Sequence, residues 1–85
     1  MAEPINERIA LILKTSGLTQ AEFGERIHIS RSLAGSLCTG ARQPSDRTIL
    51  DICRVYGVSE LWLREGHGEM YVQRTLRQEI LDLAR

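Results

Sequence analysis

Few side chains in this 85-residue sequence could bind a metal ion or act as a thiol nucleophile. They are His28, Cys38, Cys53 and His67. None of them has the close spacing to another that a zinc site needs. The sequence also offers no nucleophile paired with a base, no glycine-rich phosphate loop and no carboxylate cluster. We therefore expect no enzyme activity, metal, cofactor or small-molecule ligand, and interpret the cysteines as small, buried, reduced thiols.

The basic side chains are unevenly distributed along the chain. Residues 31–54 carry four arginines and two aspartates, whereas residues 1–30 and 55–85 each carry one more acidic than basic side chain. The net charge of the whole chain is zero, which argues against a strong general attraction to polyanions. A mild positive excess therefore lies in the middle of the sequence.

Helices must position these arginines, because apolar residues recur with helical spacing throughout. Ile5, Ile9, Ile12 and Leu13, for example, share one helix face. Helix caps and stop residues then divide the chain into five expected helices. These run from Pro4 to Gly17, from Thr19 to about Ile27, over about Arg31–Thr39, from Ser45 to Gly57 and from Ser59 to Gly66.

The second and third expected helices are joined by only three residues, His28-Ile29-Ser30, which makes them a helix-turn-helix candidate. Two helices that cross this closely leave little room, so the site at Gly24 must be small. Ala34 and Leu37 are expected to face the core.

With this pair the chain resembles the lambda-repressor-like (XRE-type) helix-turn-helix domains of phage repressors, Cro proteins and bacterial regulators. The resemblance spans about residues 5–66. It is carried by Gly17-Leu18-Thr19-Gln20, Ile29-Ser30, Gly40, Pro44-Ser45, Thr48-Ile49-Leu50, Ile52 and residues 57–63, which read GVSELWL. It implies an all-α, five-helix DNA-binding domain with a C-terminal helical appendage. It also implies a sequence-specific, DNA-binding transcriptional regulator that binds double-stranded DNA as a homodimer.

The resemblance also implies which residues meet DNA. The helix over residues 31–39 would lie in the major groove, with Arg31 bonded to a guanine and Ser32 and Ser36 facing outward. The backbone amides that follow the caps Thr19 and Ser30 would favour phosphate oxygens. The remaining DNA-binding residues would be Gln20, a phosphate ligand that props a neighbouring side chain, Ser30 at the start of the recognition helix, and Arg42, a phosphate ligand.

Gly35 lies inside the expected recognition helix, where glycine is unfavourable. A smooth outer face of Ser32, Gly35 and Ser36 would let the helix sit deep in the groove. One alternative is that Gly35 is a surface glycine without a role, and another is that the chain is a decayed prophage remnant with poor DNA readout.

Two departures from the family pattern have structural consequences. His28 stands where the turn usually has glycine, so we expect His28 in the left-handed conformation, which His adopts more readily than most residues. Leu13 and Cys38 stand where relatives often have a buried ion pair of Arg and Glu. Because both charges are missing together, we expect an apolar contact between Leu13 and Cys38 in its place.

The last residues form a separate segment in this interpretation, with a helix-turn-helix domain over residues 1–68 and an extension over residues 69–85. Met70-Tyr71-Val72 is a candidate for a brief strand. Leu76, Ile80 and Leu83 make a helical apolar stripe, which we expect to pack on a second subunit. The alternative is that the stripe folds back on its own domain.

A second class of function fits the same fold. The zero net charge favours a protein-interaction module, antitoxin-like or antirepressor-like, that does not bind specific DNA. No apolar run is long enough to span a membrane, and Met1-Ala-Glu-Pro lacks the cationic start of a secretory signal. We therefore expect a cytoplasmic protein.

Overall fold

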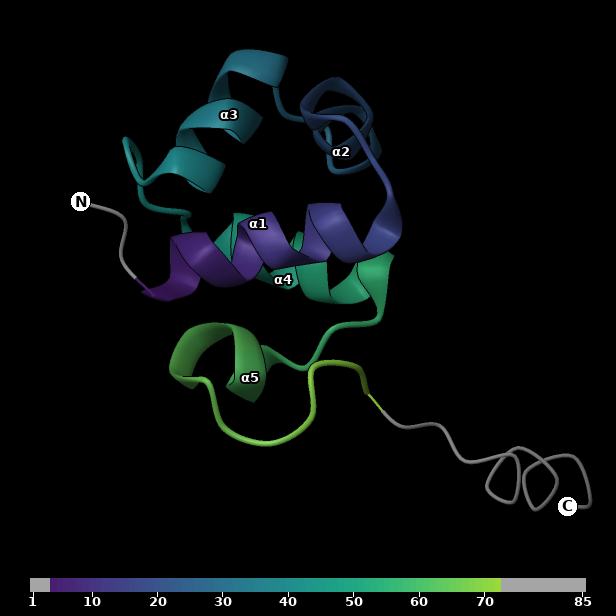
Figure 1. The fold of residues 1–85 in the computed structure, drawn as a ribbon, viewed down its shortest axis with the longest axis vertical. Helices are drawn as coiled ribbons and strands as arrows, with labels where there is room; N and C mark the ends of the chain where they lie inside the picture. Colours follow the sequence, from purple (N-terminus) through teal and green to yellow (C-terminus); the bar gives the residue numbers. More distant parts are fainter. Residues whose placement is uncertain (1–3, 73–85) are drawn as a thin grey trace, which may run out of the picture.

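The computed structural model describes residues 4–72, and all regular elements within that range are α-helices. They are α1 (Pro4–Ser16), α2 (Gln20–Arg26), α3 (Arg31–Thr39), α4 (Asp46–Tyr56) and α5 (Glu60–Glu65). In Figure 1, α1 crosses the middle of the domain, with α2 and α3 on one side of it and α5 on the other. The predicted all-α, five-helix architecture is confirmed.

Local capping explains why the helices begin where they do. Thr19, Ser30, Ser45 and Ser59 each accept a hydrogen bond from the backbone N–H three residues later, as expected for N-caps. At α2 the Glu22 carboxylate also accepts from the Thr19 N–H at 3.0 Å, which completes a capping box. This bond lowers the pKa of Glu22.

The core fills the space between the helices with apolar side chains. Its fully covered members are Ile9, Ile12, Phe23, Ala34, Ile52 and Leu63, at 0% exposure. The ring of Phe23 stacks on that of Tyr56 with centroids 5.0 Å apart, and the Tyr56 hydroxyl donates to the Phe23 carbonyl at 3.3 Å. These two contacts tie α4 to α2.

The position of the missing ion pair is apolar. Leu13 is buried in the core, and Cys38 packs against the same core. Both thiols are free, as predicted, but Cys38 and Cys53 are half-buried and not buried as expected. Each lies toward the edge of its helix's inward face, where partial desolvation still raises the pKa of both thiols.

The chain after α5 returns to the start of that helix. Tyr71 forms an antiparallel bridge with Val58, and the Ser59 and Val72 N–H groups donate to the Met70 and Gly57 carbonyls at 2.9 and 2.8 Å. The strand expected at residues 70–72 is thus reduced to this bridge. The predicted dimerisation residues Leu76, Ile80 and Leu83 lie outside the described residues. Within residues 4–72, no helix has the length and apolar character to span a membrane.

Candidate nucleic-acid interface

The turn between α2 and α3 is fixed by close backbone contact. The Ile29 N–H donates to the Gly24 carbonyl at 2.8 Å. A Cβ atom on Gly24 would lie 2.8 Å from the Ile29 carbonyl oxygen, so the predicted need for a small residue there is confirmed. His28 has a φ of 60°, the left-handed conformation predicted for it. These features set the relative direction of α2 and α3.

The helix α3 has an inner and an outer face. Ala34 and Leu37 are buried at 0% and 1% exposure, as predicted. Arg31 and Ser32 are exposed and Ser36 is half-buried, so all three reach the outer surface. Within residues 4–72 the Arg31 guanidinium forms no ion pair. A cation is therefore available at the start of α3, where a recognition helix contacts base edges.

Gln20 of α2 lies over α3 at Gly35. A Cβ atom on Gly35 would lie 2.9 Å from the Gln20 Oε1 atom. Gln20 and Gly35 line one shallow hollow on the outer face of α3, together with Arg31, Ser32, Ser36 and Thr39. Gly35 is thus not the bare surface position that the sequence indicated, because a side chain from another helix covers it.

A buried asparagine holds the segment that follows α3. Asn6 has 0% exposure, and its Nδ2 donates to the carbonyls of Leu37 at 2.7 Å and Arg42 at 3.0 Å. Its Oδ1 accepts from Gln43 Nε2 at 3.0 Å. The backbone that carries the exposed Arg42 side chain is therefore hydrogen-bonded to α1. Sequence reasoning missed Asn6, although a polar residue on the same helix face as Ile9 was a signal for it.

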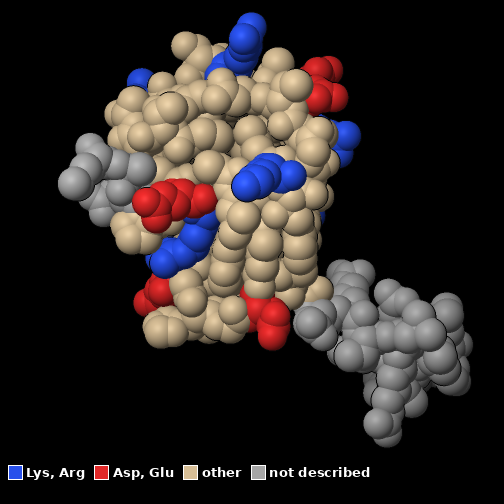
Figure 2. All heavy atoms as spheres, viewed as in Figure 1, with Lys and Arg blue, Asp and Glu red and all other residues tan. Residues whose placement is uncertain are grey.

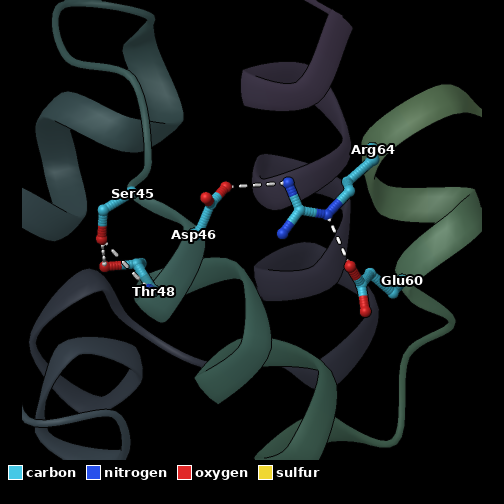
Figure 3. Close-up of polar contacts among 5 residues, drawn as sticks. All are labelled: Ser45, Asp46, Thr48, Glu60 and Arg64. Carbon is cyan, nitrogen blue, oxygen red and sulfur yellow. Dashed lines mark hydrogen bonds and ion pairs between the residues drawn. The ribbon is translucent and has the colours of Figure 1, made fainter.

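The acidic side chains near α3 and α4 are paired with arginines. Arg64 of α5 reaches Asp46 at the start of α4 at 3.0 Å and Glu60 at 2.7 Å, as Figure 3 shows. These contacts raise the pKa of Arg64. Asp51 pairs with Arg54 at 3.0 Å. Sequence spacing does not predict the Arg64–Asp46 pair, because the two residues lie 18 positions apart in the chain.

Because these aspartates are paired, the arginines that form no ion pair among residues 4–72 give the middle of the chain its free surface charge. Arg31, Arg42 and Arg47 are exposed and form no ion pair within the described part of the chain, whereas both aspartates of residues 31–54 do. On the face drawn in Figure 2, however, basic and acidic side chains are interspersed and no broad basic area is visible. The charges on this face therefore supply no broad positive field.

Of the six predicted DNA-binding residues, the structure brings four to one face. Gln20, Arg31, Ser32 and Ser36 share the hollow on α3. Ser30 is exposed, but its hydroxyl serves as the N-cap by accepting from the Leu33 N–H at 3.0 Å. Arg42 follows the end of α3, outside the hollow.

Comparison with known proteins adds independent information. Residues 8–65 match the family described as "Helix-turn-helix domain". Similar curated proteins include the "HTH-type transcriptional regulator for conjugative element SXT" of Vibrio cholerae and the "HTH-type transcriptional regulator for conjugative element pMERPH" of Shewanella putrefaciens. Each is 30% identical over 66 residues, which is 78% of this chain and 30% of the relative. No solved structure gives a significant match.

Proposed function

Because this chain belongs to the helix-turn-helix domain family, we propose that it is a sequence-specific, DNA-binding transcriptional regulator. The observation that carries the proposal is the outer face of α3, where the exposed Arg31 begins a helix that is held firmly against α2. The names of the relatives, which are transcriptional regulators for conjugative elements, support regulation of transcription. Since the chain spans 30% of their length, their other properties are not carried over.

In this proposal the residues divide into base-reading and phosphate-binding groups. Arg31 donates two hydrogen bonds to a guanine, and Ser32 and Ser36 lie against neighbouring base edges. The phosphate backbone is bound by Gln20, which also props a neighbouring side chain, by the helix start at Ser30 and by Arg42. Phosphate contacts fix the register of the protein on the duplex and carry no sequence information.

The regulator acts in this proposal as a cytoplasmic homodimer on double-stranded DNA. The apolar stripe of Leu76, Ile80 and Leu83 supplies the contact between subunits, since a short isolated helix is marginal in water. Two copies of α3 would then stand about 34 Å apart, one turn of the duplex. Sedimentation of a chain ending at Gly68 tests the stripe, because an unchanged dimer would remove residues 69–85 from the interface.

A second candidate function rests on the charge distribution. The zero net charge and the interspersed surface charges in Figure 2 favour a protein-interaction module that keeps the fold without binding specific DNA. Such a protein would be antitoxin-like or antirepressor-like. The arginines at and after α3 that form no ion pair within residues 4–72 favour the DNA-binding function.

Selection from a library of random DNA duplexes distinguishes the two functions. The full chain is incubated with the library at low salt, where phosphate contacts are strongest, and bound duplexes are amplified and sequenced. A regulator enriches a palindromic site, and Arg31→Ala should enrich it less. An absence of enrichment at low salt would refute DNA readout and favour the interaction module.

A further inference from the structure

The carboxamide of Gln20 occupies the space that a side chain at position 35 would take. Its Oε1 atom lies 2.9 Å from the place of a Gly35 Cβ, and its amide carbon lies 3.5 Å from that place. Neither contact involves the backbone of α2, so the glycine makes room for this one side chain. A residue with a Cβ atom would push the Gln20 amide away from α3.

Gln20 lies close to Arg31 on the surface of the domain. Gln20 and Arg31 together line two adjoining hollows, one over α3 and one beside the start of α2. A carboxamide carries both donors and an acceptor. The Gln20 side chain therefore borders both Arg31 and the outer face of α3, where the placement of its amide affects what that face presents to a duplex.

We infer that Gly35 is a positioning residue that sets the base selectivity of α3 by keeping the Gln20 amide on its outer face. The inference rests on the proposed DNA-binding function. It explains why a helix former does not occupy this position, since glycine weakens a helix relative to alanine. Gly35 and Gln20 then act as one unit, so their substitutions have non-additive effects.

A double-mutant cycle tests the inference with the full-length chain. Wild type, Gln20→Ala, Gly35→Ala and the double variant are each titrated with the library-selected duplex and with its single-base variants. Gly35→Ala should reduce discrimination at one base pair per half-site by about ten-fold, in the range of one lost polar base contact. In the Gln20→Ala background the same change should have no further effect. Thr15→Ala, at an exposed position of α1 outside this hollow, is the control and should leave selectivity unchanged.

Thermal unfolding separates this effect from damage to the fold. Gly35→Ala should raise the melting temperature by roughly 4 °C, because alanine favours the helix and the flexible end of Gln20 can move aside. The increase should be larger in the Gln20→Ala background, where no amide must move. A variant that is more stable yet less selective would show that Gly35 acts through position and not through folding.

Several results would overturn the inference. Unchanged selectivity in Gly35→Ala, or additive losses in the double variant, would show that the two residues act separately. An equal loss of affinity for all duplexes would make Gln20 a phosphate ligand only. If the wild-type chain itself binds no duplex selectively, the proposed function is refuted, whereas selective wild-type binding that survives Gly35→Ala refutes this inference alone.

Discussion

Replacing Asn6 with alanine should be among the most destabilising single changes in this domain. The asparagine Nδ2 donates to the carbonyls of Leu37 and Arg42, and Leu37 is in the last turn of α3. The last four carbonyls of a helix have no intrahelical donor, so the Leu37 carbonyl depends on a donor from elsewhere. Asn6→Ala removes that donor at a site with 0% exposure.

The expected cost follows from the contacts. Asn6→Ala removes three hydrogen bonds, two to carbonyls and one from Gln43 Nε2. The buried Leu37 carbonyl left without a donor costs about 1–3 kcal/mol, and the lost bond from Gln43 costs about 1 kcal/mol. Because water can replace the donor to the partly buried Arg42 carbonyl, we expect a total of about 2–4 kcal/mol. This is a large share of the roughly 5–15 kcal/mol that stabilises a typical domain. Gln43→Ala removes only the bond to Asn6 Oδ1 and should cost about 1 kcal/mol.

Urea unfolding followed by fluorescence of Trp62, the single tryptophan, measures these free energies. With a slope of about 1 kcal/mol/M for a small domain, Asn6→Ala should lower the midpoint by roughly 2 M or more. Lys14→Ala, at an exposed position of the same helix, should stay within about 0.5 kcal/mol of wild type. An Asn6→Ala variant as stable as this control would refute the role of Asn6 as the anchor of the segment after α3.

Three further substitutions test the packing and the caps. Gly24→Ala should lower the melting temperature, because the added Cβ would lie 2.8 Å from the backbone oxygen of Ile29. The expected cost is about 1–3 kcal/mol of unfolding free energy. A melting temperature at or above that of wild type would contradict this close approach. Leu13→Arg should lower the free energy of unfolding in urea by several kcal/mol, since it buries a charge without a partner. Wild-type stability of this variant would count against an apolar contact of Leu13 and Cys38 in place of the ion pair. The bond from Thr19 lowers the pKa of Glu22 below its ordinary 4.5, so the stability that Glu22 adds is present above pH 4.5 and is lost as the pH falls through the lowered pKa. The difference in unfolding free energy between wild type and Glu22→Gln should therefore shrink in acid, and a difference independent of pH would rule out this cap.

The helix boundaries were predictable because the interactions that set them are local. A cap such as Thr19 acts on a backbone N–H three residues away, and the stop at Gly40 depends on the conformation of that residue itself. The helix-turn-helix followed from the same signals, with Gly24 marking the close approach of two helices. Patterns of this kind are complete within one or two turns of chain.

The features that sequence reasoning missed all join distant residues. Asn6 bonds to carbonyls 31 and 36 positions later, and Arg64 reaches back 18 positions to Asp46. The contact of Gln20 with Gly35 depends on how α2 and α3 cross, which spacing alone does not determine. For the same reason the candidate site was predicted as a set of separate residues and not as a hollow with an amide at its edge.

The proposed function makes one claim about α3, which is that it reads base sequence through Arg31 while Arg42 binds phosphate. Binding curves for wild type, Arg31→Ala and Arg42→Ala, measured on the selected duplex and its single-base variants at several salt concentrations, test it directly. Arg31→Ala should cost roughly 1–3 kcal/mol on the preferred site and relax selectivity at one base pair per half-site. Arg42→Ala should weaken all duplexes about equally and reduce the salt slope by about one per subunit. A uniform loss in Arg31→Ala, with base preference intact, would contradict the claim.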